Sequence, residues 1–400
     1  MIPAPVKHKF LTPGVVVLIL IALNGLVFLA VRFFSGIGAV TNLTNETPWG
    51  LWIGVDVAAG VALAAGGFTS AALGHVMHRE EYHAIVRPAL LTAMLGYTFV
   101  AFGVVVDIGR FYYIWHPLIM WNGNSALFEV GICVMIYLTV LYIEFLPIVT
   151  ERFMNRVNLP GILEKLNRPV DKLLKYLDDR LSKTMFVFII AGVVLSTLHQ
   201  SSLGTLMVIA GPKMHPLWQT PILPLLFLLS AIAVGFPMII FESLIASRSF
   251  KMEPETHLLA GLGNMIPPFI GVYLAFKFGD MFIRETFKYV FLFDFAAWMF
   301  IAEMVLMIIP FFMFLFSKLN NKPIWLFSGA ALVVAAVLLN RVNNFIVAYN
   351  PVYKTVDYFP SFGEISVTVG CIALLVLIYR ACVMIFPVIS QKRSEIIKNL

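Results

Sequence analysis

The chain has 400 residues, of which 60% are hydrophobic and 12% are charged, and its mean hydropathy is +0.90. These values lie far outside the range of soluble globular proteins. They predict an integral membrane protein without an independent soluble domain. The net charge of +6 is explained by membrane topology, so the sequence gives no support for a nucleic-acid partner.

Runs of about 20 apolar residues, the length that crosses a hydrocarbon core of about 30 Å as a helix, recur along the whole chain. We therefore expect an all-α integral membrane protein, with about ten transmembrane helices in a single polytopic domain covering residues 1–400. The expected spans cover residues 13–34, 49–76, 86–109, 124–148, 185–209, 221–246, 258–279, 291–317, 324–346 and 365–388.

The topology follows from the number of spans and from the distribution of basic residues. An even number of spans puts both termini on one side, and lysine and arginine are more frequent in the segments on that side. The positive-inside rule then predicts that both termini are cytoplasmic. The expected location is the cytoplasmic (inner) membrane of a bacterium or archaeon, as a multi-pass protein surrounded by lipid.

The longest inner loop, residues 150–184, separates a first four-helix part (13–149) from a six-helix part (185–388). Its segment "ILEKLNRPVDKLLKYLDDRLSK" has apolar residues at helical spacing with charges between them. This pattern predicts an amphipathic helix that lies in the membrane surface after the fourth span. A docking face for a partner on the inner side is the alternative.

Polar residues inside the apolar spans are the strongest functional signal, because ionisable groups in a bilayer usually face a cavity, a partner charge or an ion path. A quinone needs an apolar slot and polar groups that exchange protons near its carbonyls, and an imidazole with an ordinary pKa of about 6.5 suits that task. We expect a quinone-binding and proton-transfer site in the outer half of the membrane. Its candidates are Asp56, Asp107, Arg110, Glu129, His199 and Gln200. For each residue, a helix-packing network without turnover is the alternative.

A second polar set suggests a proton route. His75, Glu144 and Glu242 lie nearer the inner face, and Glu303 lies near the middle of the eighth span. These residues either pump protons or supply the quinone site from the inner side.

Haem, iron–sulfur clusters and metal ions are not expected in this chain. A b-type haem needs two histidines at similar depth, but His75 lies at the inner end of its span and His199 in the outer half. The three cysteines lie within spans without ligand spacing, and one iron–sulfur cluster usually needs four thiolates.

Several segments, in this order along residues 48 to about 365, resemble one family. They are "TPWGLWIGVDVAAGVALAAGG", "YHAIVRPALLTAMLGY", "DIGR", "SALFEVGICVMIYLTVLYIEFLP", "LHQSSLGTLMVIAG", "HPLWQTPILPLLFLLSAIAVGFPMIIFES" and "YFPSFGE". They look like the NrfD/polysulfide reductase membrane-subunit family. The likeness is strongest to its ten-helix branch, the hydrogenase "cytochrome b-type" subunits, which also serves sulfate-reducer transmembrane redox complexes.

The resemblance implies a haem-free, quinone-reactive subunit of a menaquinone-linked oxidoreductase complex. Such a subunit docks a ferredoxin-like iron–sulfur subunit on the periplasmic side and exchanges electrons with menaquinone near that face. A catalytic redox subunit, a multihaem cytochrome c, or both would complete the complex, so the chain would not be catalytic alone.

The family motifs carry over to individual residues. The second-span motif supplies Asp56, "DIGR" supplies Asp107 and Arg110, "LFE" supplies Glu129, and "HQSS" supplies His199 and Gln200. The "IEF" and "IFES" segments supply Glu144 and Glu242 as proton-route carboxylates. A redox-coupled proton-translocating subunit and a passive membrane anchor remain alternatives, and the terminal enzyme and the direction of electron flow stay open.

Overall fold

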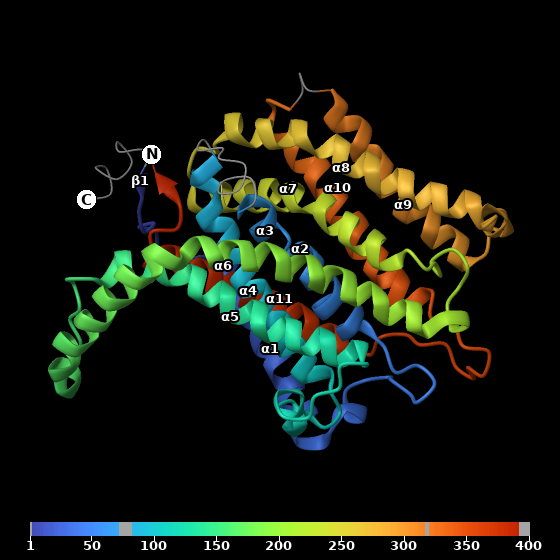
Figure 1. The fold of residues 1–400 in the computed structure, drawn as a ribbon, viewed down its shortest axis with the longest axis horizontal. Helices are drawn as coiled ribbons and strands as arrows, with labels where there is room; N and C mark the ends of the chain where they lie inside the picture. Colours follow the sequence, from blue (N-terminus) through green and yellow to red (C-terminus); the bar gives the residue numbers. More distant parts are fainter. Residues whose placement is uncertain (1, 72–81, 317–319, 392–400) are drawn as a thin grey trace.

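The computed structural model describes residues 2–71, 82–316 and 320–391. These residues form a helical bundle (Figure 1), in which ten helices are long and apolar enough to cross a membrane. The predicted all-α membrane fold is therefore confirmed. The spans are α1 (Pro13–Ser35), a second span (Trp52–Ser70), α4 (His83–Asp107), α5 (Ala126–Phe153), α6 (Asn167–Ala210), α7 (Leu223–Phe250), α8 (Thr256–Ile283), α9 (Phe295–Leu315), α10 (Pro323–Val342, continued by η11, Asn343–Val347) and α11 (Phe362–Ile385).

The two described ends of the chain meet on one side of the bundle. Strand β1 (Ile2–Pro3) pairs antiparallel with β2 (Ser390–Gln391), with Ile2 opposite Gln391. This pairing agrees with an even number of spans. We call this side the inner face and the opposite side the outer face; the orientation in the cell stays a prediction.

The second span consists of three consecutive pieces. A π-helical stretch, η2 (Trp52–Ala59), is followed by α2 (Gly60–Leu63) and α3 (Gly66–Ala71). Its small residues let the backbone approach α4 closely, because a Cβ atom at Gly67 would lie 2.3 Å from the Cβ of Ala93. The span is largely buried at the centre of the molecule.

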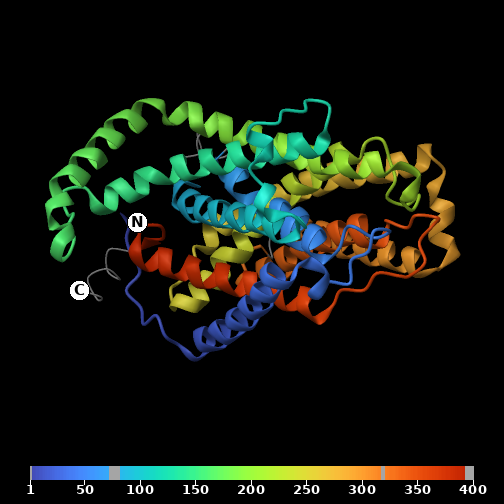
Figure 2. The ribbon, with the colours of Figure 1, turned by 90° about the horizontal axis from the view of Figure 1, so that it is seen from below.

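The other helices form two groups and a pair around this central span. Helices α4, α5 and α6 pack on one side of it, and α7, α8, α9 and α10 form the second group. Helices α1 and α11 pack along each other at the edge of the molecule (Figure 2, blue and red). They meet closely at two glycines, since a Cβ atom at Gly25 would lie 2.8 Å from the Cα of Gly370.

The inner loop differs from the prediction in one respect. Residues 162–166 of the amphipathic segment belong to a short 3-10 helix, η7 (Gly161–Leu166). The rest of the segment is not a separate helix, because it is the first part of the 44-residue α6 that continues into the fifth span. The physical reason is that no proline or glycine interrupts the chain between Pro169 and Gly192. Figure 2 shows α6 curving toward its inner end. Its placement in the membrane surface stays a prediction.

Candidate functional site

An apolar cavity of about 300 Å³ lies between the second span, α4 and α11, with contributions from α7 and α10. Its polar lining consists of Asp56, Thr92 and Cys371, and the other lining residues are glycine or hydrophobic. The Asp56 carboxylate accepts a hydrogen bond from the Thr368 hydroxyl at 2.7 Å. The cavity therefore combines an apolar slot with one anchored carboxyl group.

The outer end of this cavity carries a cluster of charged groups. Arg32 of α1 is 1% exposed and donates to the carbonyl oxygens of Val106 at 2.6 Å and Ile108 at 2.5 Å. Asp107 interacts electrostatically with Arg32 and with Glu364, which is fully buried. This arrangement places Asp107, a predicted site residue, beside the Asp56 end of the cavity.

Glu364 is fixed by the start of α11. Its carboxylate accepts from the backbone amides of Asn42 at 3.1 Å and Ser361 at 2.9 Å, and from the Tyr358 hydroxyl. Ser361 and Glu364 form a capping box. Burial and the bond to Glu364 raise the pKa of the Tyr358 phenol above its ordinary value, so Tyr358 stays protonated as a donor.

His199 and Gln200 lie on the other side of the second span. Gln200 donates from Nε2 to the carbonyl oxygen of Val61 at 2.7 Å, and both side chains are fully buried. Neither residue lines the Asp56 cavity. The structure therefore separates the predicted outer set into two compartments, with Asp56 and Asp107 in one and His199 and Gln200 in the other.

The His199 compartment contains a buried imidazole without hydrogen-bond partners among the described residues, since neither ring nitrogen of His199 has one. The Tyr97 hydroxyl lies beside the side chains of Ser196 and Gln200. The rings of His199 and Tyr97 lie 5.7 Å apart. Buried polar groups normally bind a partner or ordered water, so this compartment is suited to hold water or a mobile proton.

The remaining two residues of the predicted outer set lie at the surface. Glu129 is exposed at the outer end of α5 and accepts a hydrogen bond from Ser202 at 2.6 Å. Arg110 is exposed in the loop after α4. Neither side chain lines the Asp56 cavity.

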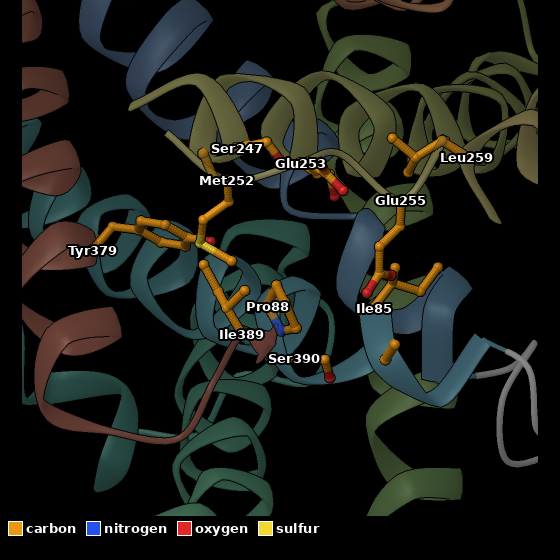
Figure 3. Close-up of a pocket in the computed structure, with 13 residues that line it drawn as sticks. Ile85, Pro88, Ser247, Met252, Glu253, Glu255, Leu259, Tyr379, Ile389 and Ser390 are labelled. Carbon is orange, nitrogen blue, oxygen red and sulfur yellow. The ribbon is translucent and has the colours of Figure 1, made fainter. Parts of the chain in front are cut away.

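On the inner side, Glu242 of α7 lies beside Thr92 and Tyr379. Thr92 lines the large cavity, whereas Tyr379 lines a second hollow of about 60 Å³ at the inner face. Figure 3 shows Tyr379, Glu253 and Glu255 around this hollow. Burial raises the pKa of Glu255 above its ordinary value. Glu242 thus contacts one residue from each hollow.

Glu144 belongs to the α5–α6 interface. A Cβ atom at Gly192 would lie 2.5 Å from Oε1 of Glu144, and this oxygen has no hydrogen-bond partner in the described part of the chain. Glu144 also interacts electrostatically with Tyr137, whose ring packs on that of Tyr97. It therefore lies on the His199 side. His75 lies outside the described residues.

Glu303 lies in the second helix group, away from both compartments. Its carboxylate accepts hydrogen bonds from Trp218 at 3.0 Å, Asn340 at 2.8 Å and Asn343 at 2.7 Å. Two buried cations, Lys277 and Arg341, interact with it electrostatically. Glu303 therefore has a full set of donors and two countercharges.

The loop between α6 and α7, residues 211–222, covers the outer end of this second group. Lys277 donates to the Leu217 carbonyl oxygen at 3.0 Å, and Thr220 donates to Asp280 at 2.8 Å. The Nδ1 of His215 accepts from the Leu217 amide at 3.3 Å. Burial lowers the pKa of His215, and the nearby Asp294 partly opposes this shift, so the ring is neutral when it accepts this bond.

Sequence reasoning missed several members of these clusters. The candidate residues from the sequence did not include Arg32, Lys277, Arg341 or Trp218. The signal for Glu364 was the pattern Ser361-x-x-Glu364 before an apolar run, which marks a helix start with a fixed carboxylate. No sequence pattern indicates that Arg32 turns inward.

Comparisons with known proteins give the same family along most of the chain. The family described as "Polysulphide reductase, NrfD" matches residues 39–352. The "Probable Ni/Fe-hydrogenase 2 b-type cytochrome subunit" of Escherichia coli (strain K12) is 32% identical over 398 residues, which cover 98% of this chain and 96% of that protein. A protein of Nitratidesulfovibrio vulgaris is 35% identical over 397 residues, 97% of each chain. The "Menaquinone reductase, integral membrane subunit" of the same organism is 27% identical over 384 residues, 90% of this chain and 87% of that protein.

Proposed function

The chain belongs to the polysulphide reductase NrfD family, and from this membership and the cavity we propose that it is the quinone-reactive membrane subunit of a respiratory redox complex. It exchanges electrons between an iron–sulfur partner subunit and menaquinone. The name of the menaquinone reductase relative supports the substrate. The hydrogenase relative and the menaquinone reductase relative are both named as subunits, which supports a function within a larger complex.

The observation that carries this proposal is the apolar cavity with the Asp56–Thr368 pair at one end. Its volume of about 300 Å³ is at the lower end of the range for small-molecule sites, about 300–1,000 Å³. Oxidation of menaquinol to menaquinone releases two electrons and two protons. The electrons pass to the iron–sulfur partner. The Asp56 carboxylate accepts the two hydroxyl protons one after the other and passes the first to the charged groups at the outer end before it takes the second; reduction runs the same steps in reverse.

Thr368 orients the carboxylate for this transfer. Its hydroxyl donates to one oxygen of Asp56, so the other oxygen is the one available to a quinol hydroxyl. Asp107, with Arg32 and Glu364, supplies further charged groups at the outer end, the side from which the partner is expected to approach. The protons leave or enter through these groups.

We assign His199 and Gln200 a different role from the one expected. Because the second span separates them from the cavity, they do not contact the quinone ring. The unpartnered imidazole instead holds a proton or water next to the second span, and Gln200 fixes this span through Val61. Glu129 and Arg110 act at the outer surface, where the iron–sulfur partner or the catalytic subunit docks.

A proton route to the inner face is a second candidate function, supported by the position of Glu242. Tyr379, Glu242 and Thr92 connect the inner hollow with the Asp56 cavity, and Glu242 lies inside the membrane part of α7. Glu144 with Tyr137 offers a separate path on the His199 side. Glu303, with three donors and two countercharges, has a structural role in the second group.

The haem implied by the name of the Escherichia coli relative does not fit the described residues. The structure gives the burial of five histidine side chains, those of His8, His116, His199, His215 and His257, and only His199 of these five is fully buried. These five histidines therefore do not supply a buried axial pair. We propose that menaquinone is a substrate and that the redox centres belong to partner subunits.

The test is quinone-linked activity of the intact complex in membranes. Asp56→Asn keeps the size of the side chain but removes its ability to accept a proton. We expect at least roughly a 100-fold loss of menaquinol turnover, while the partner subunits still co-purify. Full activity would exclude the quinone-site assignment. A passive anchor would also retain activity in this variant.

A further inference from the structure

The Asp56 cavity is open toward the membrane on one side. Among its lining residues, Ile372 and Val376 of α11 are 51% and 42% exposed. Both lie within a membrane span, where an exposed apolar side chain faces lipid. The same two side chains therefore contact the cavity and the hydrocarbon core.

The helices around this side explain the opening. Helix α11 packs along α1 and touches α4 and the second span, whereas α10 packs on α7, α8, α9 and the second span. Among these fully described helices, α10 and α11 do not pack along each other. Leu338 of α10 lines the cavity opposite the α11 residues. The gap between α10 and α11 is thus the place where the cavity meets lipid.

The residues of α11 that border this gap lie on a different face of the helix from those that pack against α1. Gly370 and Ala373 face α1. Ile372 and Val376 are one turn apart and lie on a different face of α11. The face of α11 toward α1 is closed by this packing. A ligand from the membrane can therefore reach the cavity at the face that carries Ile372 and Val376.

We propose that a membrane-dissolved molecule with a polar ring and a long apolar tail enters sideways between α10 and α11, and that its tail stays in this portal while its ring reaches Asp56. This inference rests on the proposed quinone site. The portal, defined by Ile372, Val376 and Leu338, fits such a ligand because its walls are apolar and its mouth lies in hydrocarbon. The single carboxyl group, that of Asp56, belongs to the second span, which forms the wall of the slot away from the lipid.

The experiment compares Ile372→Trp and Val376→Trp with Val369→Trp in the intact complex. Val369 is a matched control, since it is 44% exposed on α11 but does not line the cavity. Turnover is measured with a menaquinol that carries a long isoprenoid tail and with a naphthoquinol that has no tail.

We expect both portal tryptophans to raise the KM for the long-tailed menaquinol roughly tenfold, with a much smaller change for the tailless naphthoquinol. Val369→Trp keeps the wild-type KM. Equal effects on both substrates, or portal variants that behave like Val369→Trp, would overturn the portal. When the portal variants give one of these contrary results, Asp56→Asn shows which proposal is wrong. Full menaquinol turnover in Asp56→Asn then excludes the quinone site itself, whereas an inactive Asp56→Asn excludes the portal and leaves the quinone site in place.

Discussion

Thr368 of α11 donates a hydrogen bond of 2.7 Å to Asp56 of the second span, although 312 positions separate the two residues in the chain. The bond joins the edge pair α1–α11 to the central span at the end of the apolar cavity. It also fixes one oxygen of a carboxylate that otherwise faces an apolar slot. The proposed proton transfer depends on this relationship.

Thr368→Val is therefore expected to lower menaquinol turnover roughly tenfold, because it removes the donor and leaves the Asp56 oxygen without its partner. The side-chain shape is nearly kept, so the complex should assemble. Thr368→Ser restores the hydroxyl and should recover most of the activity. Wild-type turnover of Thr368→Val, measured in membranes, would show that the hydrogen bond has no role in the reaction.

Glu242→Gln and Tyr379→Phe are expected to slow proton exchange between the cavity and the inner face. Each removes a titratable or donating group between the two hollows but keeps the side-chain size. The measurement is the change of internal pH in proteoliposomes during quinone turnover. Glu144→Gln is the comparison, because it lies on the His199 side; a larger effect of Glu144→Gln than of Glu242→Gln would move the route to the α5–α6 interface.

Glu303→Ala is expected to destabilise the second helix group. The substitution leaves three donors without an acceptor and two buried cations without a countercharge. Breaking a buried charge pair costs about 3–5 kcal/mol, so the thermal unfolding midpoint of the detergent-solubilised protein should fall by several degrees. Glu303→Gln keeps part of the hydrogen bonding and should fall less. An unchanged midpoint in Glu303→Ala would contradict the structural role.

The outer loop that carries His215 should loosen in acid. Because burial lowers the pKa of His215, the opened loop binds a proton more readily than the closed loop. Closure is therefore fully stable above the ordinary histidine pKa of about 6.5 and weakens as the pH falls from there toward the lowered value. Hydrogen–deuterium exchange at the amides of Trp218 and Gln219, which bond to the His215 carbonyl oxygen, measures this opening.

His215→Asn is the control for this pH effect. Its amide oxygen can still accept from the Leu217 amide, but the side chain does not titrate. Exchange at Trp218 and Gln219 should then be independent of pH between about 5 and 7, after correction for the intrinsic exchange rate. The same pH dependence in His215→Asn would mean that another group controls the loop.

The number and positions of the spans could be predicted from the sequence, because the thickness of a bilayer fixes the length of each apolar run. The boundary of α6 could not be predicted in the same way. Its charged first part and its apolar second part differ in composition, but helical hydrogen bonding continues without a break from Asn167 to Ala210. Composition indicates where a helix enters lipid, whereas the ends of the helix are set by where backbone hydrogen bonding stops.

Which candidate residues lie together in space was harder to predict, for a physical reason. Counting residues from a span end gives the depth of a side chain, but not the direction in which it points around the helix axis. Asp56 and His199 were both expected in the outer half, yet they lie on opposite sides of the second span. Only the packing of the helices decides that direction. Arg32 shows the same limit, because a charge at a span end usually faces the interface.

The most direct test of the quinone site is to find which helices contact the quinone. An azido-substituted menaquinone can be cross-linked by light in the intact complex, and the labelled peptides identified by mass spectrometry. We predict labels within residues 96–106 of α4 and 367–376 of α11, which line the Asp56 cavity. Labels confined to residues 129–144 of α5 and 196–203 of α6, around His199, would contradict this site and place the quinone in the other compartment.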